Sequence, residues 1–378
     1  MAKLANTHFI GVLRENSGWG QASRDYLTSL DTISQHWLSA RPILLGSPNY
    51  KLDDKLKELC IRKTGECDFL IQHCHPFLMS PSGLVKKNIG LFVTECSHFR
   101  NSNWTKHLNL MDEVWVPCKH NQKACIDSGV KVPVKIVHHA CDIERYSRSV
   151  PQNDVVKELK DEGNFVFYTI GDFNPRKNIE TLIRAFHIEF NCNEPVALVI
   201  KTSHESCHNG HLKILVSDMI NRIINESGLR KRGRPISIIV DRLSDAALLG
   251  LHASADAFVQ TSFAESWSIP AFDAMAMGKT PIVPNYSGYL EYIDEGVGYP
   301  IPTHIEYGHS LGHSEWNPMG ADVEVGRVDL QSLRDIMREV YESGDKREEK
   351  AKKGIDKALN FSFKNIGHQM FSHILEGL

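Results

Sequence analysis

Short apolar runs alternate with amphipathic helical segments along almost the whole chain, and this alternation constrains the fold more than any other feature. Ten runs have the length of strands: His8–Leu13, Asp68–Gln72, Asn88–Thr94, Glu113–Val116, Val134–His138, Phe165–Gly171, Val196–Lys201, Ile236–Asp241, Ala257–Thr261 and Thr280–Val283. Several are apolar at consecutive positions, as strands buried on both faces of a parallel sheet must be. The pattern predicts α/β units built on parallel sheets.

The length predicts two domains. The chain has 378 residues, and single cores stop growing at roughly 250–300 residues. Five of the predicted strands lie before the polar stretch Arg145–Asp154 and five after it, so this stretch is the best candidate for a linker. Open parallel sheets bind ligands at the carboxyl ends of their strands, and the candidate residues are therefore sought there.

Composition excludes some classes of function. The formal net charge is -3 and the isoelectric point about 6.7, so no global field attracts nucleic acid or anionic membrane. Met1–Thr7 is polar, and no run approaches the roughly 20 apolar residues of a spanning helix. The nine cysteines are scattered without C-x-x-C pairs and are interpreted as reduced thiols. These features predict a soluble protein of the cytoplasm.

The first motif is a basic strand-to-helix turn. Asp172–Arg176 follows the strand that ends at Gly171, and Lys177–Phe190 is predicted to be a helix with one apolar stripe. Arg176 and Lys177 would then lie beside the unpaired N–H groups of the helix start, where a diphosphate could bind. The alternative is a solvated basic pair, although cations oppose the dipole at a helix N-terminus.

The second motif places two carboxylates eight residues apart. Glu265 lies in the loop after the strand that ends at Thr261, and Asp273 lies in a short apolar helix that begins near Ser268 and ends at Gly278. A buried unpaired Asp273 would be costly, which favours a hydrogen-bonded partner such as a ligand diol. The structural alternative is an exposed Glu265 and an Asp273 that caps its own helix.

The segment Val259–Pro284 resembles the Glu-x₇-Glu signature of family 4 retaining glycosyltransferases, the glycosyl transferases group 1. The matching residues are Ser262, Glu265, Pro270, Ala274, Met275, Ala276, Gly278 and Pro281. Asp273 stands at the second Glu, Ser266 and Ser268 replace two glycines, and Trp267 takes the aromatic place between them. The basic turn resembles the family's G-x-x-x-P-R-K-N pattern, except that Asp172 stands where many members have Arg.

The first half resembles the family more coarsely. Ser17–Arg24 is a glycine-bearing turn, and Asp112–Pro117, Ser128–Val130 and Val134–Asp142 resemble the run toward an interdomain hinge. Many members place a His of the catalytic site in a T-x-H context, where this chain has Thr94–His98. Glu95 is the candidate for that role, and the candidates on the acceptor side are His73, His75 and His98. Each could equally be a satisfied polar residue.

The resemblance implies a GT-B fold. This consists of two Rossmann-like α/β domains with parallel sheets facing across a cleft, and a C-terminal helix that returns to the first domain. The implied divisions are 1–148 for the acceptor side, 149–358 for the nucleotide sugar, and 359–378 for the returning helix, whose apolar residues lie between Phe361 and Ile374.

The implied activity is retaining transfer from a nucleotide-diphosphate sugar, such as a UDP- or GDP-sugar, to an acceptor hydroxyl, with no cofactor and no metal. Arg176 and Lys177 would balance the diphosphate, Glu265 would hold the sugar and Asp273 the ribose. Further contacts to the donor are implied for Gly18, Trp19, Gly20, Ser266, Trp267, Ser268 and Ile269. The acceptor would be a glycan, a lipid-linked molecule or a small molecule.

Three other functions stay open. One is a non-catalytic nucleotide-sugar-binding protein, because Asp172, Ser266 and Ser268 depart from the pattern. Another is an epimerase or an inverting enzyme of the same fold. The third is a transferase that modifies a DNA base, with phosphate contacts from the basic stretch Leu229–Pro235. A metal site is not expected, because neither His73–His75 nor His204–His211 has the paired ligand spacing of structural zinc.

Overall fold

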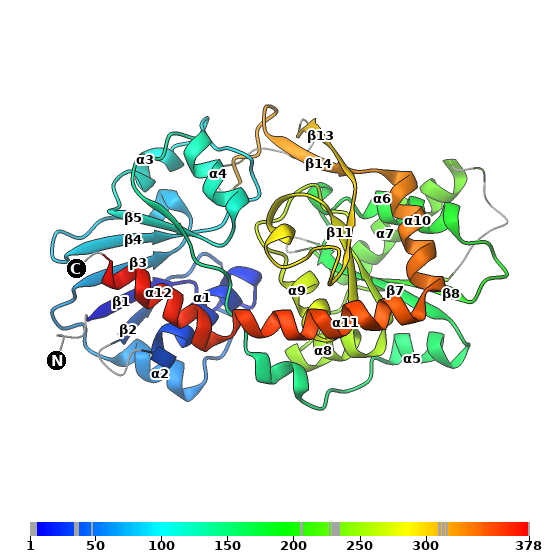
Figure 1. The fold of residues 1–378 in the computed structure, drawn as a ribbon, viewed down its shortest axis with the longest axis horizontal. Helices are drawn as coiled ribbons and strands as arrows, with labels where there is room; N and C mark the ends of the chain where they lie inside the picture. The colour runs from blue at the N-terminus through cyan, green and yellow to red at the C-terminus, as the bar shows by residue number, and fades with distance from the viewer. Residues whose placement is uncertain are drawn as a thin grey trace. The chain divides into compact units, whose positions relative to one another are not determined.

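The structure is a computed structural model that describes residues 6–33, 38–46, 48–204, 207–226, 228, 235–308, 311, 314 and 317–376. Contacts divide the chain into two compact units. Unit 1 comprises Met1–Ile143, Gly312–Glu324 and Leu359–Leu378, and unit 2 comprises Glu144–Leu311 and Val325–Ala358. Each unit has its own sheet (Figure 1).

Unit 1 is built on a six-stranded sheet whose order is β2-β1-β3-β4-β5-β6. All of its strand pairs are parallel. The strands are β1 (Thr7–Gly11), β2 (Leu38–Pro42), β3 (Phe69–His73), β4 (Lys87–Leu91), β5 (Glu113–Val116) and β6 (Val134–Ile136). The helices are α1 (Gly18–Ile33), α2 (Asp54–Ile61), α3 (Trp104–Leu108), α4 (Lys119–Asp127) and α12 (Phe363–Leu375), with 3₁₀ turns η1 (Pro76–Leu78) and η5 (Leu359–Phe361).

The C-terminal helix α12 packs against α1 in unit 1, as Figure 1 shows. Ile366, Met370 and Ile374 are buried on one side of α12, at helical spacing. A Cβ built on Gly367 would lie 2.3 Å from the carbonyl oxygen of Ser29, so the two backbones approach too closely for any side chain. The predicted return of the last helix to the first domain is confirmed.

Unit 2 has a second six-stranded sheet, with the order β12-β11-β10-β7-β8-β9. Its strand pairs are parallel as well. The strands are β7 (Phe165–Asp172), β8 (Val196–Ser203), β9 (Ile236–Ile239), β10 (Ala257–Val259), β11 (Thr280–Pro284) and β12 (Tyr299–Ile301). A separate two-stranded sheet pairs β13 (Thr303–Tyr307) with β14 (Glu324–Val328).

The helices that cover this second sheet complete unit 2. They are α5 (Asp154–Asp161), α6 (Ile179–Glu189), α7 (Asn209–Glu226), α8 (Asp245–Ser254), α9 (Ile269–Ala276), α10 (Leu330–Glu342) and α11 (Gly344–Ala358). The 3₁₀ turns are η2 (Ile143–Ser147) before α5, η3 (Pro175–Lys177) between β7 and α6, and η4 (Ser287–Glu291) between β11 and β12. Apolar residues of α6, α7, α10 and β8 meet in one buried core cluster.

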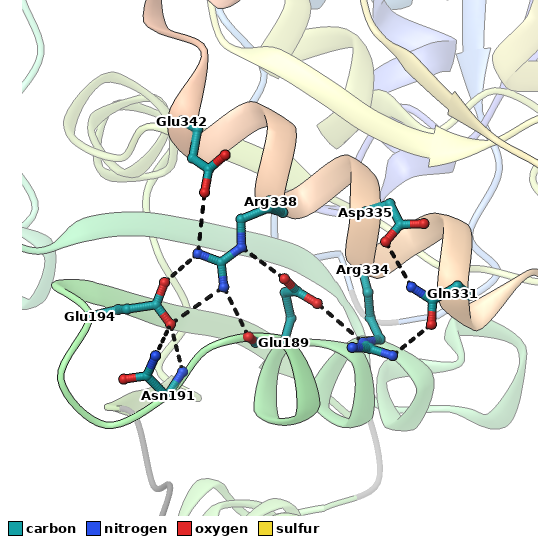
Figure 2. Close-up of polar contacts among 8 residues, drawn as sticks. All are labelled: Glu189, Asn191, Glu194, Gln331, Arg334, Asp335, Arg338 and Glu342. Atoms are coloured by element: carbon teal, nitrogen blue, oxygen red, sulfur yellow. Dashed lines mark hydrogen bonds and ion pairs between the residues drawn. The ribbon is translucent and has the colours of Figure 1, made fainter.

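An ion-pair network fastens α10 to the end of α6 (Figure 2). Arg338 Nε lies 2.8 Å from Glu189 Oε1, and its other guanidinium nitrogens contact Glu194 and the backbone carbonyl of Glu189. Arg334 Nε lies 3.2 Å from the second oxygen of the same Glu189 carboxylate. The hydrogen bonds that Arg338 donates to the Glu194 carboxylate come first among the causes that raise the pKa of Arg338. This network holds the C-terminal end of α6, the helix that follows the basic turn.

All ten predicted strands are present, and the predicted α/β class with two parallel sheets is confirmed. The sequence analysis missed β2 and β12, which lie at the edges of the two sheets, and the pair β13–β14. Both missed edge strands carry a proline, Pro42 in β2 and Pro300 in β12, and neither has a continuous apolar run. Among the described residues, no helix is long and apolar enough to cross a membrane.

We expect Gly367→Ala to destabilise unit 1 by about 1–3 kcal/mol, because the new methyl would overpack the α1–α12 contact. Thermal or denaturant unfolding would measure the loss. Gly83→Ala is the matched control, because a Cβ there would meet nothing within 4 Å. Equal stability of the two variants would contradict the close approach of α12 to α1.

Candidate functional site

The basic turn after β7 differs from the prediction in one respect. Asn174 Oδ1 accepts a hydrogen bond from the backbone N–H of Lys177, and this interaction closes the 3₁₀ turn η3. Asn178 then adopts a left-handed conformation with φ 49°, and α6 begins only at Ile179. The helix therefore starts two residues later than predicted, because Asn174 and Pro175 nucleate a separate turn. Arg176 and Lys177 precede α6 and are not its first residues.

Glu265 is the counter-ion of both cations of this turn. Its Oε1 lies 2.6 Å from Lys177 Nζ and 2.9 Å from Arg176 Nη1. Arg176 Nη1 also donates to the carbonyl of Ala264 at 2.7 Å. The side chain of Glu265 is 6% exposed, whereas those of Arg176 and Lys177 are 16% and 11% exposed. The structure thus joins residues that the sequence places 88 positions apart.

This pairing keeps Glu265 ionised. Burial alone would raise the pKa of its carboxyl, but the charges of Arg176 and Lys177 outweigh burial and lower that pKa from 4.5 to about 2. A carboxylate and two cations leave one positive charge on the cluster at neutral pH. The cluster can therefore attract an anion while each of its members keeps a partner.

The backbone of Glu265 is hydrogen-bonded to a strained turn at Ser287 and Gly288. The backbone N–H of Glu265 donates to Ser287 Oγ at 3.0 Å, and the N–H of Gly288 donates to the carbonyl of Glu265 at 2.9 Å. Ser287 has φ 62°, and a Cβ built on Gly288 would lie 2.1 Å from the carbonyl oxygen of Ser266. Only glycine fits this approach, so the backbone around Glu265 is held on two sides. The sequence analysis did not single out Ser287 or Gly288.

The residues after Glu265 lead into α9, which begins at Ile269 with Pro270 just inside it, as predicted. Ser268 has φ 70°, and its hydroxyl donates to Gln260 Oε1 at 2.6 Å. The position that is glycine in the resembling family therefore still requires the left-handed region here. Trp267 is 3% exposed and packs against Tyr292 with ring centroids 4.8 Å apart. Ser266 is buried.

Asp273 is separate from the cation cluster in its contacts. It is 1% exposed, Tyr146 donates to its Oδ1 at 2.6 Å, and Arg145 Nη2 lies 3.2 Å from its Oδ2. Arg145 and Tyr146 belong to η2, in the stretch interpreted as a polar linker. The linker interpretation did not indicate that Arg145 is buried, which it is because it pairs with this carboxylate. The only signal in the sequence was the need of a buried Asp273 for a partner.

In unit 1, the predicted glycine-bearing turn follows β1 and opens α1. Ser17 Oγ accepts from the N–H of Gly20 at 3.1 Å and so caps the helix. A Cβ built on Gly20 would lie 2.0 Å from the carbonyl oxygen of Glu15, so the turn requires glycine there. Gly18 is exposed and Trp19 half-buried. Arg24, which the sequence analysis missed, donates to the carbonyls of Leu13 and Glu15 and fixes the loop.

Trp19 lies against two histidines, His73 of β3 and His75 directly before η1. Its ring centroid lies 5.0 Å from that of His73 and 4.5 Å from that of His75. His73 Nδ1 is 2.5 Å from Ser23 Oγ, which also accepts from the N–H of Val12. Burial lowers the pKa of His73 well below its usual value and that of His75 to about 4, so both rings are neutral at pH 7.

Glu95 and His98 lie in the loop after β4. Glu95 is half-buried, and its carbonyl accepts from His120 Nε2 at 3.4 Å. His98 is 5% exposed, and its Nε2 donates to the carbonyl of Asp322 at 3.1 Å. The structure therefore gives His98 a partner within unit 1 that the sequence could not indicate. The roles predicted for Gly18, Trp19, Gly20, Glu95, His73, His75 and His98 stay predictions.

Two weaker sequence hypotheses concern residues that the structure describes only in part. The basic stretch Leu229–Pro235 lies outside the described residues apart from Pro235, and two residues of His204–His211 are also outside them. Within the described part of the chain, no three His, Cys, Asp or Glu side chains are grouped so that they could hold a metal ion.

Two units that are each built on a six-stranded parallel sheet define a fold of the GT-B class, and solved structures share it. HepE (Alr3699) from Anabaena, crystallised with UDP and glucose, is 15% identical, with a TM-score of 0.65 over 99% of this chain and 100% of that chain. Sucrose-phosphate synthase (tll1590) from Thermosynechococcus elongatus is 13% identical, with a TM-score of 0.65 over 99% of both chains. At these identities the likeness shows the fold.

Residues 151–307 match the family of glycosyl transferases group 1, so the predicted resemblance to that group is confirmed for this segment. The segment contains Arg176, Lys177, Glu265 and Asp273. A protein named as a glycosyltransferase, ORF313 of Acidianus filamentous virus 1, is 30% identical over 103 residues. That match spans 26% of this chain and 32% of the viral protein.

The ion cluster makes stability depend on pH in a defined direction. The pKa of Glu265 falls from 4.5 to about 2 on folding, so its stabilisation is complete above pH 4.5 and is lost as the pH falls through about 2. We expect Glu265→Gln to be less stable than the wild type at pH 7, by on the order of 3 kcal/mol. Urea unfolding from pH 7 to pH 3 should show this gap narrowing below pH 4.5. A gap of constant size would contradict the ion cluster.

At most positions alanine is more stable than glycine, but the left-handed backbone of Ser268 predicts that its glycine variant is more stable than its alanine variant. Ser268→Ala and Ser268→Gly both lose the hydrogen bond to Gln260, but only glycine relieves the positive φ. Ser268→Gly should therefore be the more stable of the two by about 1 kcal/mol. Ser217 in α7 is the control, because in a regular helix alanine is more stable than glycine by about 1 kcal/mol. Denaturant midpoints of the four variants test both orders.

Proposed function

We propose that this chain is a glycosyltransferase that moves a sugar from a nucleotide-diphosphate sugar to an acceptor hydroxyl. The observation that carries the proposal is the cluster of Arg176, Lys177 and Glu265, which lies within the segment that matches the glycosyl transferases group 1. HepE, with the same fold, was crystallised with UDP and glucose, which supports a UDP-sugar as the first donor to test.

The charges of this cluster suit a leaving diphosphate. As the anomeric bond breaks, negative charge develops on the phosphate, and Arg176 and Lys177 lie fixed and partly exposed to receive it. Glu265 holds both cations in place before any ligand arrives, so little reorganisation is needed at the moment of reaction. In this proposal the two side-chain cations supply the charge that other transferases take from a metal ion, and no metal is required.

Retention by front-face attack is part of the proposal. A double displacement would require Glu265 to act as a nucleophile, but its pKa of about 2 and its two cationic partners make it a weak one. We therefore assign Glu265 the role of orienting the cations and the sugar hydroxyls. The leaving phosphate would assist deprotonation of the acceptor hydroxyl. The acceptor is proposed to be a glycan, a lipid-linked molecule or a small molecule.

The rival functions predict different experimental outcomes. A non-catalytic binding protein would bind a nucleotide sugar without turnover, an epimerase would convert one nucleotide sugar into another, and an inverting enzyme would give the opposite linkage. A transferase that modifies DNA bases would bind DNA with a steep dependence on salt. The basic residues of the stretch that suggested this last function lie outside the described residues.

A screen of nucleotide diphosphates by thermal shift tests the donor site. At a concentration about 100-fold above its Kd, the right nucleotide should stabilise the protein by about 2.7 kcal/mol. Lys177→Ala should remove most of this shift, because the phosphate loses one of the two partly exposed cations of the cluster. Lys353→Ala, which removes an exposed lysine of α11, is the matched control. Failure of every nucleotide diphosphate to stabilise the wild type would overturn the proposal.

Donor turnover tests the enzyme itself. We expect slow hydrolysis of the right nucleotide sugar, unchanged by EDTA and reduced by about 10²–10³-fold in Lys177→Ala, the range seen when one preorganised donor is lost. With an acceptor, the NMR spectrum of the product should show the anomeric configuration of the donor. An inverted linkage would contradict retention, and tight binding without turnover would favour the non-catalytic alternative.

A further inference from the structure

The second acid of the Glu-x₇-Glu-like motif has unexpected partners in this chain. Asp273 lies within α9 and is 1% exposed. Its Oδ1 accepts from the hydroxyl of Tyr146 at 2.6 Å, and its Oδ2 lies 3.2 Å from Arg145 Nη2. Each carboxylate oxygen is therefore engaged by a side chain of η2, at the point where the chain enters unit 2.

Arg145 is itself held from two sides. Its side chain is 8% exposed, and its Nη2 lies 3.2 Å from Asp245 Oδ1 as well as from Asp273. Asp245 lies in the first turn of α8, which contacts α9. One guanidinium thus joins η2 to α8 and α9. A buried carboxylate with a charged and a neutral donor is well satisfied, and its removal would leave Arg145 without its buried partner.

The length of the side chain fits this arrangement. Asp has one methylene fewer than the Glu of the resembling pattern, so its carboxylate stays close to the backbone of α9. A Glu at the same position would carry the carboxylate about 1.5 Å farther from α9. In this buried place an extra methylene must displace Tyr146 or Arg145, because packed interiors accommodate added volume poorly.

We infer that Asp273 is a positioning residue that clamps η2 to α9, and that it does not hold the ribose of the donor. The clamp acts on the site through α9, because this helix begins directly after the loop that carries Glu265. The part of the inference that concerns ribose rests on the proposed function, whereas the clamp rests on the contacts alone.

Stability measurements on the full chain test the clamp. We expect Tyr146→Phe and Asp273→Asn each to lower the melting temperature by several degrees. The decrease in melting temperature of the double variant should be smaller than the sum of the decreases of the two single variants, because the two residues share one interaction. Asp273→Glu should also melt at a lower temperature than the wild type, although it restores the residue of the family pattern.

The clamp would be overturned if Asp273→Glu were as stable as the wild type. It would also be overturned if the double variant lost as much stability as the sum of Tyr146→Phe and Asp273→Asn. Tyr146→Phe removes only one hydroxyl and keeps the test open if Asp273→Asn fails to fold.

Nucleotide binding separates the clamp from a ribose ligand. The probes are UDP and 2′-deoxy-UDP, with GDP and 2′-deoxy-GDP as the second pair, measured by calorimetry on the wild type and on Asp273→Asn and Asp273→Glu. The quantity compared is the dissociation constant of the 2′-deoxy nucleotide divided by that of the ordinary nucleotide. If Asp273 is a clamp, this ratio should stay within about twofold of the wild-type value in both variants, even if both constants rise together. If this ratio falls about tenfold or more in Asp273→Asn because only the affinity for UDP is lost, Asp273 is a ribose ligand.

Activity gives the readout that a purely structural role would not change. If the clamp positions the loop of Glu265, donor hydrolysis by Tyr146→Phe should show a lower kcat with a nearly unchanged KM, at a temperature well below its melting point. A kcat equal to that of the wild type would reduce Asp273 to a structural residue and contradict the inference. If no nucleotide diphosphate binds the wild type, the proposed function fails, and the stability cycle still decides the clamp.

Discussion

The ion cluster of Glu265 with Arg176 and Lys177 is the interaction on which the candidate site depends. Two cations side by side, with side chains only 16% and 11% exposed, would repel each other and lose part of their hydration. One carboxylate within 3 Å of both compensates this cost, and it keeps the side chains in one geometry. Because the cluster retains one positive charge, it is stable as it stands and still able to bind an anion. The same contacts thus serve the fold and the proposed chemistry.

Backbone strain surrounds this cluster. Three residues around the cluster adopt the left-handed conformation. Asn178 directly follows Lys177, Ser268 lies three residues after Glu265, and Ser287 accepts a hydrogen bond from the backbone N–H of Glu265. They are the only non-glycine residues with positive φ in the described part of the chain. Each costs of the order of 1 kcal/mol or more and persists only where its surroundings fix it. Hydrogen bonds of the Ser268 and Ser287 hydroxyls supply part of that fixation. Strain of this kind is typical of functional loops.

The two acids of one sequence motif serve different parts of the molecule. Glu265 faces the basic turn after β7, whereas Asp273 faces η2. The left-handed turn at Ser268 separates them, because it changes the direction of the chain before α9 begins. Residues that match a family motif position by position can therefore have different surroundings, since a motif fixes the chain spacing but not the neighbours from elsewhere in the sequence. The motif alone therefore implies a ligand for Asp273, whereas its contacts in the structure are with Tyr146 and Arg145.

The sequence by itself determined ten of the twelve strands of the two parallel sheets, the approximate bounds of α9 and the residue types of the ion cluster. These features follow from local periodicity, turn residues and charge, which are written within a few positions of each other. Tertiary structure alone decided the edge strands β2 and β12, the pairing of Arg145 with Asp273 across 128 positions and that of His98 with Asp322 across 224. The physical reason is that a buried polar group must find a donor or acceptor, but any segment that folds against it can supply one.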